Sequence, residues 1–186
     1  MFYREDEFEE ILPKVELVNF SLGYRLRDFD CGSEDYNVFL SHDAQSYINQ
    51  NISQVKLLIN KQNGDIIGYI AYNADSFLLD PEEKAKEKLD IPFNSVPALK
   101  IGKLAVDKNY KDLPYGSFLL WLSLGILEKI NESGVGCRFI TVDADITERP
   151  DTPDFYSKNG FVLNERVNKK SRTQSISMRL DAFLDE

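Results

Sequence analysis

Residues 100–130 read KIGKLAVDKNYKDLPYGSFLLWLSLGILEKI, and they are the most informative part of the sequence about its fold. They predict a strand at residues 98–106, a turn-rich segment at 109–116, and a helix that continues to about Ser133. The helix is apolar on nearly every side, which is typical of a helix buried between layers. A strand, a tight loop and a helix N-terminus present unpaired amides beside the positive end of the helix dipole. The junction therefore suits a phosphate or pyrophosphate group, although a strand-to-helix connection without any ligand would have the same sequence pattern.

The chain before this stretch predicts a strand, a helix and a hairpin. Residues 15–20 form the strand, and Ser33 can cap a helix by accepting a hydrogen bond from a free amide. The apolar residues that follow recur at helical spacing and form one stripe: Tyr36, Phe39, Leu40, Ala44, Tyr47 and Ile48. The runs 55–60 and 66–73 resemble strands. Asn63-Gly64 between them indicates a tight hairpin, because both residues tolerate a positive φ.

The remaining segments complete an alternating pattern. Residues 80–90 are charged and contain Pro81 near their start, so we expect a short exposed helix within a long connection that ends at Pro97. The rest predicts strands at 139–144, 161–167 and 175–180, and a short helix opened by Asp151-Thr152-Pro153 and ended by Gly160. The order is β, α, β, β, β, α, β, α, β, β. It predicts one mixed α/β domain over residues 1–186, with helices covering a central sheet.

Composition and charge favour a soluble, cytoplasmic protein. The 186 residues are 42% hydrophobic, with a net charge of −9 and a pI near 4.7, and such a surface repels polyphosphates. A nucleic-acid partner is therefore disfavoured, since it would need a local basic patch. The acidic start does not fit a secretory signal, and the apolar run 118–127 is too short to span a membrane. Cys31 and Cys137 make no disulfide framework, so we expect buried thiols in a reducing compartment.

Few residues offer metal or base chemistry. One histidine and two distant cysteines cannot build a zinc site, so no metal is expected, and His42 is expected at the surface. Asp107, Asp143 and Asp145 lie near strand ends, where most aspartates are solvated or structural. The sequence therefore identifies no general base. The basic residues in 168–172 (Lys169, Lys170 and Arg172) are expected to be solvated at a hairpin tip.

A second junction reads Phe155-Tyr156-Ser157-Lys158-Asn159-Gly160-Phe161. A tyrosine on a short helix beside two phenylalanines is most often part of the core. A phenol can also donate its proton to a leaving thiolate when it lies within hydrogen-bond reach. Spacing alone does not separate these two interpretations of Tyr156.

Together the two junctions resemble the GNAT superfamily of acetyl-CoA-dependent N-acetyltransferases. The resemblance rests on Leu104-Ala105-Val106-Asp107, a loop ending in Gly116, a long apolar helix, a strand ending in Val142-Asp143-Ala144, and Phe155-Tyr156 to Gly160-Phe161. Upstream, Phe29-Asp30-Cys31-Gly32, Phe39-Leu40, Ala44 and Pro97-Ala98-Leu99 resemble the branch that includes the acetyltransferase toxins of toxin–antitoxin pairs. The match covers roughly residues 29–180. It implies a central sheet with helices on both sides, in which the fourth and fifth strands splay apart.

The resemblance also implies a site for acetyl-CoA. In the family the pantetheine arm pairs with strand backbone, which points to Leu104, Ala105 and Val106. The pyrophosphate sits on a loop of pattern Gln/Arg-x-x-Gly-x-Gly/Ala, which here reads Lys111-Asp112-Leu113-Pro114-Tyr115-Gly116 and is followed by Ser117. The tyrosine of the Phe-Tyr pair protonates the departing CoA thiolate, which points to Tyr156 as the catalytic residue.

The loop departs from the family pattern. Pro114 stands where the first glycine is usual, and it has no amide hydrogen to donate. Asp112 adds a negative charge, which Lys108 and Lys111 can offset in part. Gly116 and Ser117 still supply amides, so the sequence predicts weakened binding of CoA.

Three functions follow as hypotheses. The leading one is acetylation of a primary amine on a small molecule, peptide or protein. The second is toxin-like acetylation of aminoacyl-tRNA, against which the net charge of −9 stands. The third is a non-catalytic CoA-binding or interaction module. Family members are often dimers, so a homodimer is left open.

Overall fold

The computed structural model describes residues 5–147, 149–165 and 174–183. Its helices and strands are η1 (Glu5–Phe8), β1 (Val15–Asn19), α1 (Glu34–Val38), η2 (Phe39–Asp43), α2 (Ala44–Asn49), β2 (Gln54–Asn60), β3 (Ile66–Leu78), α3 (Pro81–Lys86), β4 (Ser95–Val106), α4 (Tyr115–Glu132), β5 (Phe139–Asp145), α5 (Thr152–Lys158), β6 (Val162–Leu163) and β7 (Ser175–Asp181). Of these, η1 is a 3₁₀ turn and η2 is a π-helical turn. The strands form one sheet in the order β1-β2-β3-β4-β5-β7-β6. The predicted mixed α/β class is confirmed.

The sheet combines antiparallel and parallel pairs. The pairs β1–β2, β2–β3, β5–β7 and β6–β7 are antiparallel. β4 and β5 are parallel, with the register running from Ala98 opposite Phe139 to Ile101 opposite Val142. Parallel neighbours need a crossover connection, and α4 supplies it between these two strands.

The chain divides into two compact units. Among the described residues, unit 1 contains 74–101, 123–147, 149–165 and 174–183, and unit 2 contains 5–73 and 102–122. The long elements β3, β4 and α4 each contribute residues to both units.

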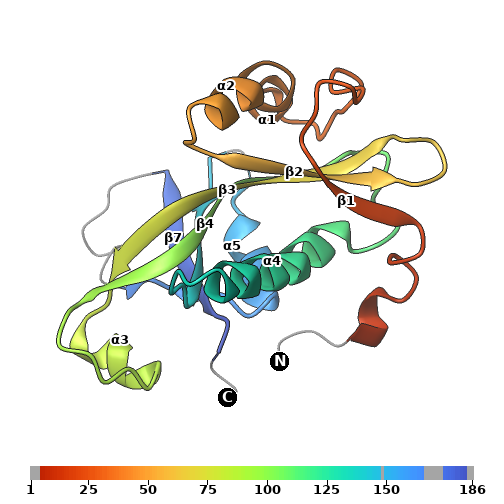
Figure 1. Ribbon diagram of the computed structural model, residues 1–186. Coiled ribbons are helices and arrows are strands. Elements are labelled where there is room, and N and C mark those ends of the chain that lie inside the picture. Colours follow the sequence, from red (N-terminus) through yellow and green to blue (C-terminus); the bar gives the residue numbers. More distant parts are fainter. Residues whose placement is uncertain (1–4, 148, 166–173, 184–186) are drawn as a thin grey trace. The chain divides into compact units, whose positions relative to one another are not determined.

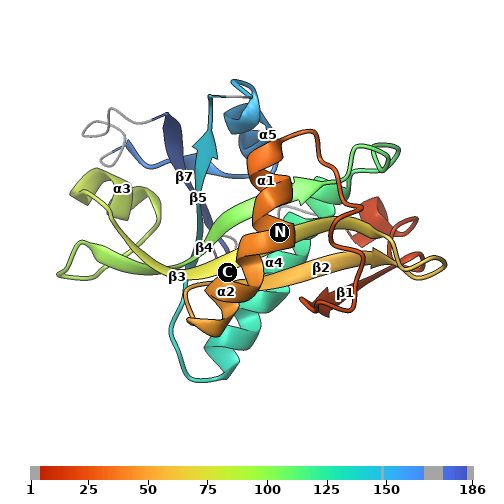
Figure 2. The same cartoon turned by 90° about the horizontal axis from the view of Figure 1, so that it is seen from above.

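In unit 2, helices lie on both faces of the strands (Figure 1). The segments α1, η2 and α2 follow one another as one helical rod over one face (Figure 2), where Phe39 stacks on Tyr69 of β3 at 6.0 Å. Gly68 faces the other side, where a Cβ would lie 3.2 Å from Leu119 of α4 and 2.8 Å from the carbonyl oxygen of Ala105. A glycine at this position therefore lets β3, β4 and α4 approach closely.

The buried residues on the rod side of unit 2 form one core. They are Leu26, Phe29, Cys31, Phe39, Leu40, Ala44, Val55, Leu57, Ile59, Ile66, Tyr69, Ala71 and Ala105. On the α4 side, Phe8 packs against Phe118 and Trp121 with ring centroids 5.3 and 5.5 Å apart. The apolar stripe predicted after Ser33 thus faces a core, although Tyr47 in it is exposed.

Two local predictions in unit 2 are wrong in detail. Ser33 does precede α1, but its hydroxyl caps nothing; it is buried without a hydrogen-bond partner in the described part of the chain. In the β2–β3 turn only Gly64 has a positive φ, of 72°. The turn spans the five residues left between the two predicted strands, and the Asn63 carboxamide accepts the N–H of Asp65 (2.9 Å).

In unit 1, α5 packs on β5 and β7, and a second core forms beside α3. This core contains Phe77, Leu79, Val96, Ala98 and Phe139. Asp80 and Glu83 build a capping box at the start of α3, with the N–H of Glu83 donating to the Asp80 carboxylate (2.9 Å). Within the described part of the chain, no helix has both the length and the apolar character needed to cross a membrane.

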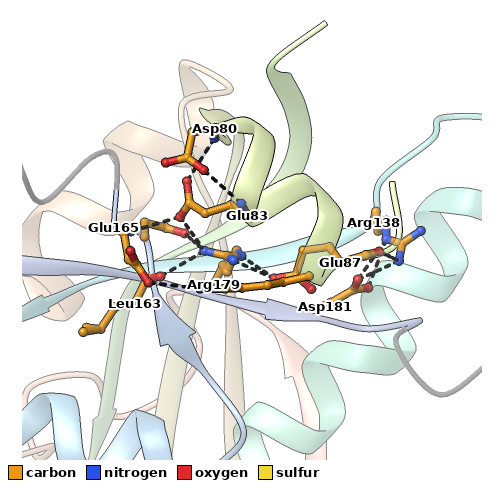
Figure 3. Close-up of polar contacts among 10 residues, drawn as sticks. Asp80, Glu83, Glu87, Arg138, Leu163, Glu165, Arg179 and Asp181 are labelled. Atoms are coloured by element: carbon orange, nitrogen blue, oxygen red, sulfur yellow. Dashed lines mark hydrogen bonds and ion pairs between the residues drawn. The ribbon is translucent and has the colours of Figure 1, made fainter. Parts of the chain in front are cut away.

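The prediction that residues 80–90 contain a short exposed helix holds for most of the segment, but two of its side chains are buried. Glu83 and Glu87 are buried because both bind the buried guanidinium of Arg179 on β7 (Figure 3). The helix α4 is also less buried than its sequence suggests. Phe118 and Leu119 are fully buried, whereas five of its apolar residues are partly exposed: Trp121, Leu122, Leu124, Ile126 and Ile130.

Candidate active site

The candidate cofactor loop, residues 107–114, joins β4 to α4 in unit 2 and begins at a buried carboxylate. The N–H of Asp107 donates to the carbonyl oxygen of Ile67 (2.8 Å), which ties the end of β4 to β3. The Asp107 side chain is 4% exposed and accepts two backbone N–H groups, from Asp30 (2.8 Å) and Asn109 (2.8 Å). These bonds make Asp107 a structural acceptor.

Asp30 binds the same loop through its backbone and its side chain. Its carbonyl oxygen accepts the N–H of Lys108 (2.8 Å), and its Oδ2 accepts the Lys108 ammonium (2.5 Å). Its Oδ1 accepts hydrogen bonds from the Gly32 N–H (2.8 Å) and the Asn37 amide (2.9 Å). The Lys108 bond is the largest of the causes that lower the pKa of Asp30 from 3.8 to about 2. Lys108, which was expected to offset the charge of Asp112 in part together with Lys111, is paired with Asp30.

The other side of the loop is held by the β2–β3 turn. The Tyr110 hydroxyl donates to Oδ2 of Asp65 (3.1 Å). Arg25 binds Oδ1 of Asp65 and the carbonyl oxygen of Asn63 (3.0 Å). The Tyr110 ring also meets the Tyr115 ring edge to face at 6.2 Å. The loop is thus fastened at two places by segments far away in the sequence.

Several amides of the loop and of the first turn of α4 have no acceptor among the residues that the structure describes. In the described part of the chain, the N–H groups of Lys111, Asp112, Gly116 and Ser117 donate to no protein atom, whereas the Tyr115 N–H donates to the carbonyl oxygen of Leu113 (2.8 Å). Lys111 is exposed, and Gly116 and Ser117 are partly exposed. Unpaired amides at the positive end of an 18-residue helix fit an anionic diphosphate.

The other predicted cofactor residues in unit 2 differ in burial. Tyr115 is buried, and desolvation is the main reason that its pKa is raised. Leu104 and Val106 are partly exposed, whereas Ala105 lies in the core of unit 2. Side chains alternate along a strand, so Leu104 and Val106 lie on the face opposite to Ala105.

Tyr156 lies on α5 in unit 1, between two phenylalanines. Its ring centroid is 5.1 Å from that of Phe155 and 5.2 Å from that of Phe161, both at steep angles. The Phe161 N–H donates to the Tyr156 carbonyl oxygen (3.1 Å), and Gly160 before it has a φ of 86°. With 5% of its surface exposed, Tyr156 is buried on α5, just before the turn that leads into β6.

The other residues considered from the sequence have structural partners or lie at the surface. Asp143 pairs with the Lys100 ammonium (2.5 Å), and Asp145 accepts the N–H of Thr147 (2.8 Å). His42 is exposed, as expected. Both cysteines are buried free thiols, and burial raises the pKa of Cys137. No group of His, Cys, Asp and Glu within the described ranges could hold a metal ion, and residues 168–172 lie outside those ranges.

The sequence alone did not reveal the partners of the loop. Asp30 and Lys108 are 78 residues apart, and Asp65 and Tyr110 are 45 residues apart, so no local spacing connects them. The only signal was indirect. Phe29-Asp30-Cys31-Gly32 belonged to the resemblance without any assigned role.

The sequence matches no protein-family model and no curated protein, whereas the fold has several solved counterparts. A bacterial toxin is 22% identical with a TM-score of 0.72, covering 90% of both chains. AtaTR bound with acetyl-CoA is 18% identical with a TM-score of 0.69, covering 91% of this chain and 94% of that one. AtaT complexed with acetyl-methionyl-tRNAfMet is 21% identical with a TM-score of 0.70, covering 88% and 93%. At these identities the likeness concerns architecture, and this chain has the fold of the GNAT-type toxin acetyltransferases.

Proposed function

We propose that this protein is an N-acetyltransferase that transfers the acetyl group of acetyl-CoA to a primary amine of a small molecule, peptide or protein. One observation carries the proposal. The amides of Lys111, Asp112, Gly116 and Ser117 have no protein acceptor in the described chain, on a fold that AtaTR shares while bound to acetyl-CoA. Amides of this kind at a helix N-terminus are the usual cradle for a diphosphate.

Within this proposal, unit 2 holds the cofactor. Gly116 and Ser117 donate their amides to the pyrophosphate, Lys111 adds a positive charge, and the backbone of residues 104–106 pairs with the pantetheine arm. Pro114 supplies no amide, and the carboxylate of Asp112 opposes an anion. We therefore expect micromolar rather than nanomolar binding. Acetyl-CoA supplies an activated acetyl thioester to the site.

Tyr156 is the proposed general acid. Its phenol donates a proton to the departing thiolate, and the packing of Phe155 and Phe161 around its ring limits the orientations that the ring can adopt. The acceptor ammonium loses its proton before attack. Asp107, Asp143 and Asp145 are already engaged with protein partners, which favours water as the proton acceptor.

The test is calorimetry with acetyl-CoA followed by turnover over a panel of amines. Tyr156→Phe should lower kcat by roughly 10²-fold or more with an unchanged KM for acetyl-CoA, because only proton donation is lost. The exposed Tyr47 provides the control, and Tyr47→Phe should behave as wild type. Full activity in Tyr156→Phe would remove Tyr156 from this role. Failure of the wild-type protein to bind acetyl-CoA at millimolar concentration would leave a non-catalytic module.

A second candidate acceptor is the amino group of an aminoacyl-tRNA. It is favoured by the similarity to AtaT complexed with acetyl-methionyl-tRNAfMet and opposed by the net charge of −9. Binding of tRNA through phosphates would weaken steeply with salt. Acetylation of charged tRNA, with a strong salt dependence and slowed growth on expression, would select this acceptor. Absence of all three would leave the small-molecule, peptide and protein amines.

A cytoplasmic location belongs to the same proposal. Both cysteines of the chain are free thiols, which is typical of proteins in reducing compartments. Fractionation of the source cells with an antibody against the protein tests this location.

A further inference from the structure

Two acidic residues lie at the start of the loop that the proposed function assigns to a diphosphate, one within the loop and one bonded to it from a distant segment. Asp107 begins the loop, and Asp30 is bonded to its second residue, Lys108. Negative charge near a bound anion is unfavourable, and Asp30 also occupies the ammonium of Lys108. On charge alone, therefore, both carboxylates weaken binding of a diphosphate.

The hydrogen bonds of these carboxylates suggest the opposite effect on diphosphate binding. Asp107 is buried and accepts the N–H groups of Asp30 and Asn109, so it joins residues 77 positions apart and sets the first turn of the loop. Lys108 returns a backbone bond to the carbonyl oxygen of Asp30. Both backbone groups of Asp30 are thus bound to residues 107 and 108, and its Oδ1 accepts hydrogen bonds from Gly32, which precedes α1, and from Asn37 within α1.

We infer that Asp107 and Asp30 are positioning residues for the diphosphate-binding loop, and that they hold residues 108–112 so that the amides of the loop stay available to the ligand. The inference rests on the proposed function and adds the residues through which that site is organised. Neither carboxylate touches the ligand in this account. The Asp107 carboxylate acts through the N–H groups of Asp30 and Asn109. The Asp30 carboxylate acts through the Lys108 ammonium and through its bonds to Gly32 and Asn37, which hold the Asp30 backbone against the loop.

The test uses variants for which positioning and charge predict effects of opposite sign. Asp107→Asn keeps the size of the side chain but turns an amide group toward one of the two N–H donors, so one bond is lost. Positioning predicts weaker binding of CoA, by roughly tenfold, because a buried hydrogen bond is broken. Charge alone predicts tighter binding. Asp30→Asn is the second variant, and the side chain that it changes is 40% exposed. We expect this variant to bind CoA several-fold more weakly than wild type.

Asp28→Asn is the matched control. It removes one negative charge two residues before Asp30, from a side chain that is 74% exposed and that pairs with Arg25 at a distance of 3.9 Å. Its affinity for CoA should equal that of wild type or exceed it slightly. Each protein is titrated with CoA and with pantetheine, which lacks the diphosphate, and its folding is checked by thermal melting.

The expected result is weaker binding of CoA by both test variants, with pantetheine binding unchanged. If the two carboxylates only stabilise the fold, the variants should lose affinity for CoA and for pantetheine to the same extent, or melt at a lower temperature without a selective loss of CoA binding. Either outcome overturns the inference. Equal or tighter CoA binding in Asp107→Asn and Asp30→Asn also overturns it while leaving the proposed function intact. If neither variant folds, the contacts serve the fold and the inference fails. If wild-type protein binds no CoA, the proposed function fails and this inference falls with it.

Discussion

Substitution of Arg179 by methionine tests how α3 is fastened to β7 in unit 1. The side chains of Arg179, Glu83 and Glu87 are only 3%, 2% and 7% exposed. The guanidinium binds Glu87 through Nε (2.8 Å) and Nη2 (2.6 Å), and Glu83 through Nη1 (3.1 Å), as Figure 3 shows. It also donates to the carbonyl oxygen of Leu163 (2.9 Å) and to Oδ1 of Asn164 (3.1 Å).

Methionine keeps much of the length of Arg179 but donates no hydrogen bond. Glu83 and Glu87 would then remain buried without their cation, and breaking a buried pair in this way costs about 3–5 kcal/mol. That is a large share of a total stability of about 5–15 kcal/mol. The ion pair between Lys86 of α3 and Glu165 is an exposed counterpart. Its side chains are 63% and 46% exposed, and its charged atoms are 3.4 Å apart. Removing Lys86 should cost no more than about 1 kcal/mol.

The assay is equilibrium unfolding in urea, followed by circular dichroism, for wild type, Arg179→Met and Lys86→Met. A third variant combines Arg179→Met with Glu83→Gln and Glu87→Gln, which removes the stranded charges and should recover part of the loss. The reasoning is refuted if Arg179→Met is no less stable than Lys86→Met. It is also refuted if the triple variant is less stable than Arg179→Met alone, since unpaired buried charge would then not be the cause.

Further predictions concern single positions. Gly68→Ala should destabilise the protein by about 1–3 kcal/mol in urea unfolding, because the new Cβ would lie 2.8 Å from the Ala105 carbonyl oxygen. Gly125→Ala is its counterpart and should stabilise by about 0.5–1 kcal/mol, since its Cβ meets nothing within 4 Å and the site is inside α4. Ser33→Ala should change stability by less than about 0.5 kcal/mol, unlike a usual cap, because the hydroxyl caps nothing. The pKa of Asp30 is lowered to about 2 in the folded protein, so its contribution is present above its usual pKa of 3.8 and is lost as the pH falls toward 2. The stability difference between wild type and Asp30→Asn should therefore be constant near neutral pH and shrink between these two values; a difference that grows on acidification would contradict the assignment.

The elements of this fold could be predicted because each leaves a local pattern. The order of helices and strands followed from apolar spacing and from turn residues such as Gly160, which has the expected positive φ. Local sequence patterns predicted burial wrongly where a residue far away in the sequence determines it. Glu83 and Glu87 look like an exposed, charged helix in sequence, yet they are buried by Arg179, which lies 92 to 96 residues further along the chain.

The candidate site was predictable only in part, for the same reason. A strand, loop and helix start at residues 104–117 can be located from sequence, and that segment lies in unit 2 as one continuous stretch. The role of Tyr156 came from resemblance, because its spacing suits a core residue equally well and the side chain is indeed buried. The bonds of Asp30 and Tyr110 to the loop and its surroundings have no counterpart in any local motif.

These distant bonds also explain how the loop can depart from the family pattern. Glycine is required in a loop where φ is positive or where another backbone approaches closely. Outside glycine, the described chain has positive φ only at Asn51 and Lys88, so Lys111, Asp112 and Leu113 all adopt conformations open to any residue. The course of the loop is set from outside by Asp30 and by the Tyr110–Asp65 contact, and a proline at position 114 is compatible with it. What the proline removes is one N–H, not the shape of the loop. The amides that remain, including those of Gly116 and Ser117, are therefore the ones on which the proposed binding of a diphosphate depends.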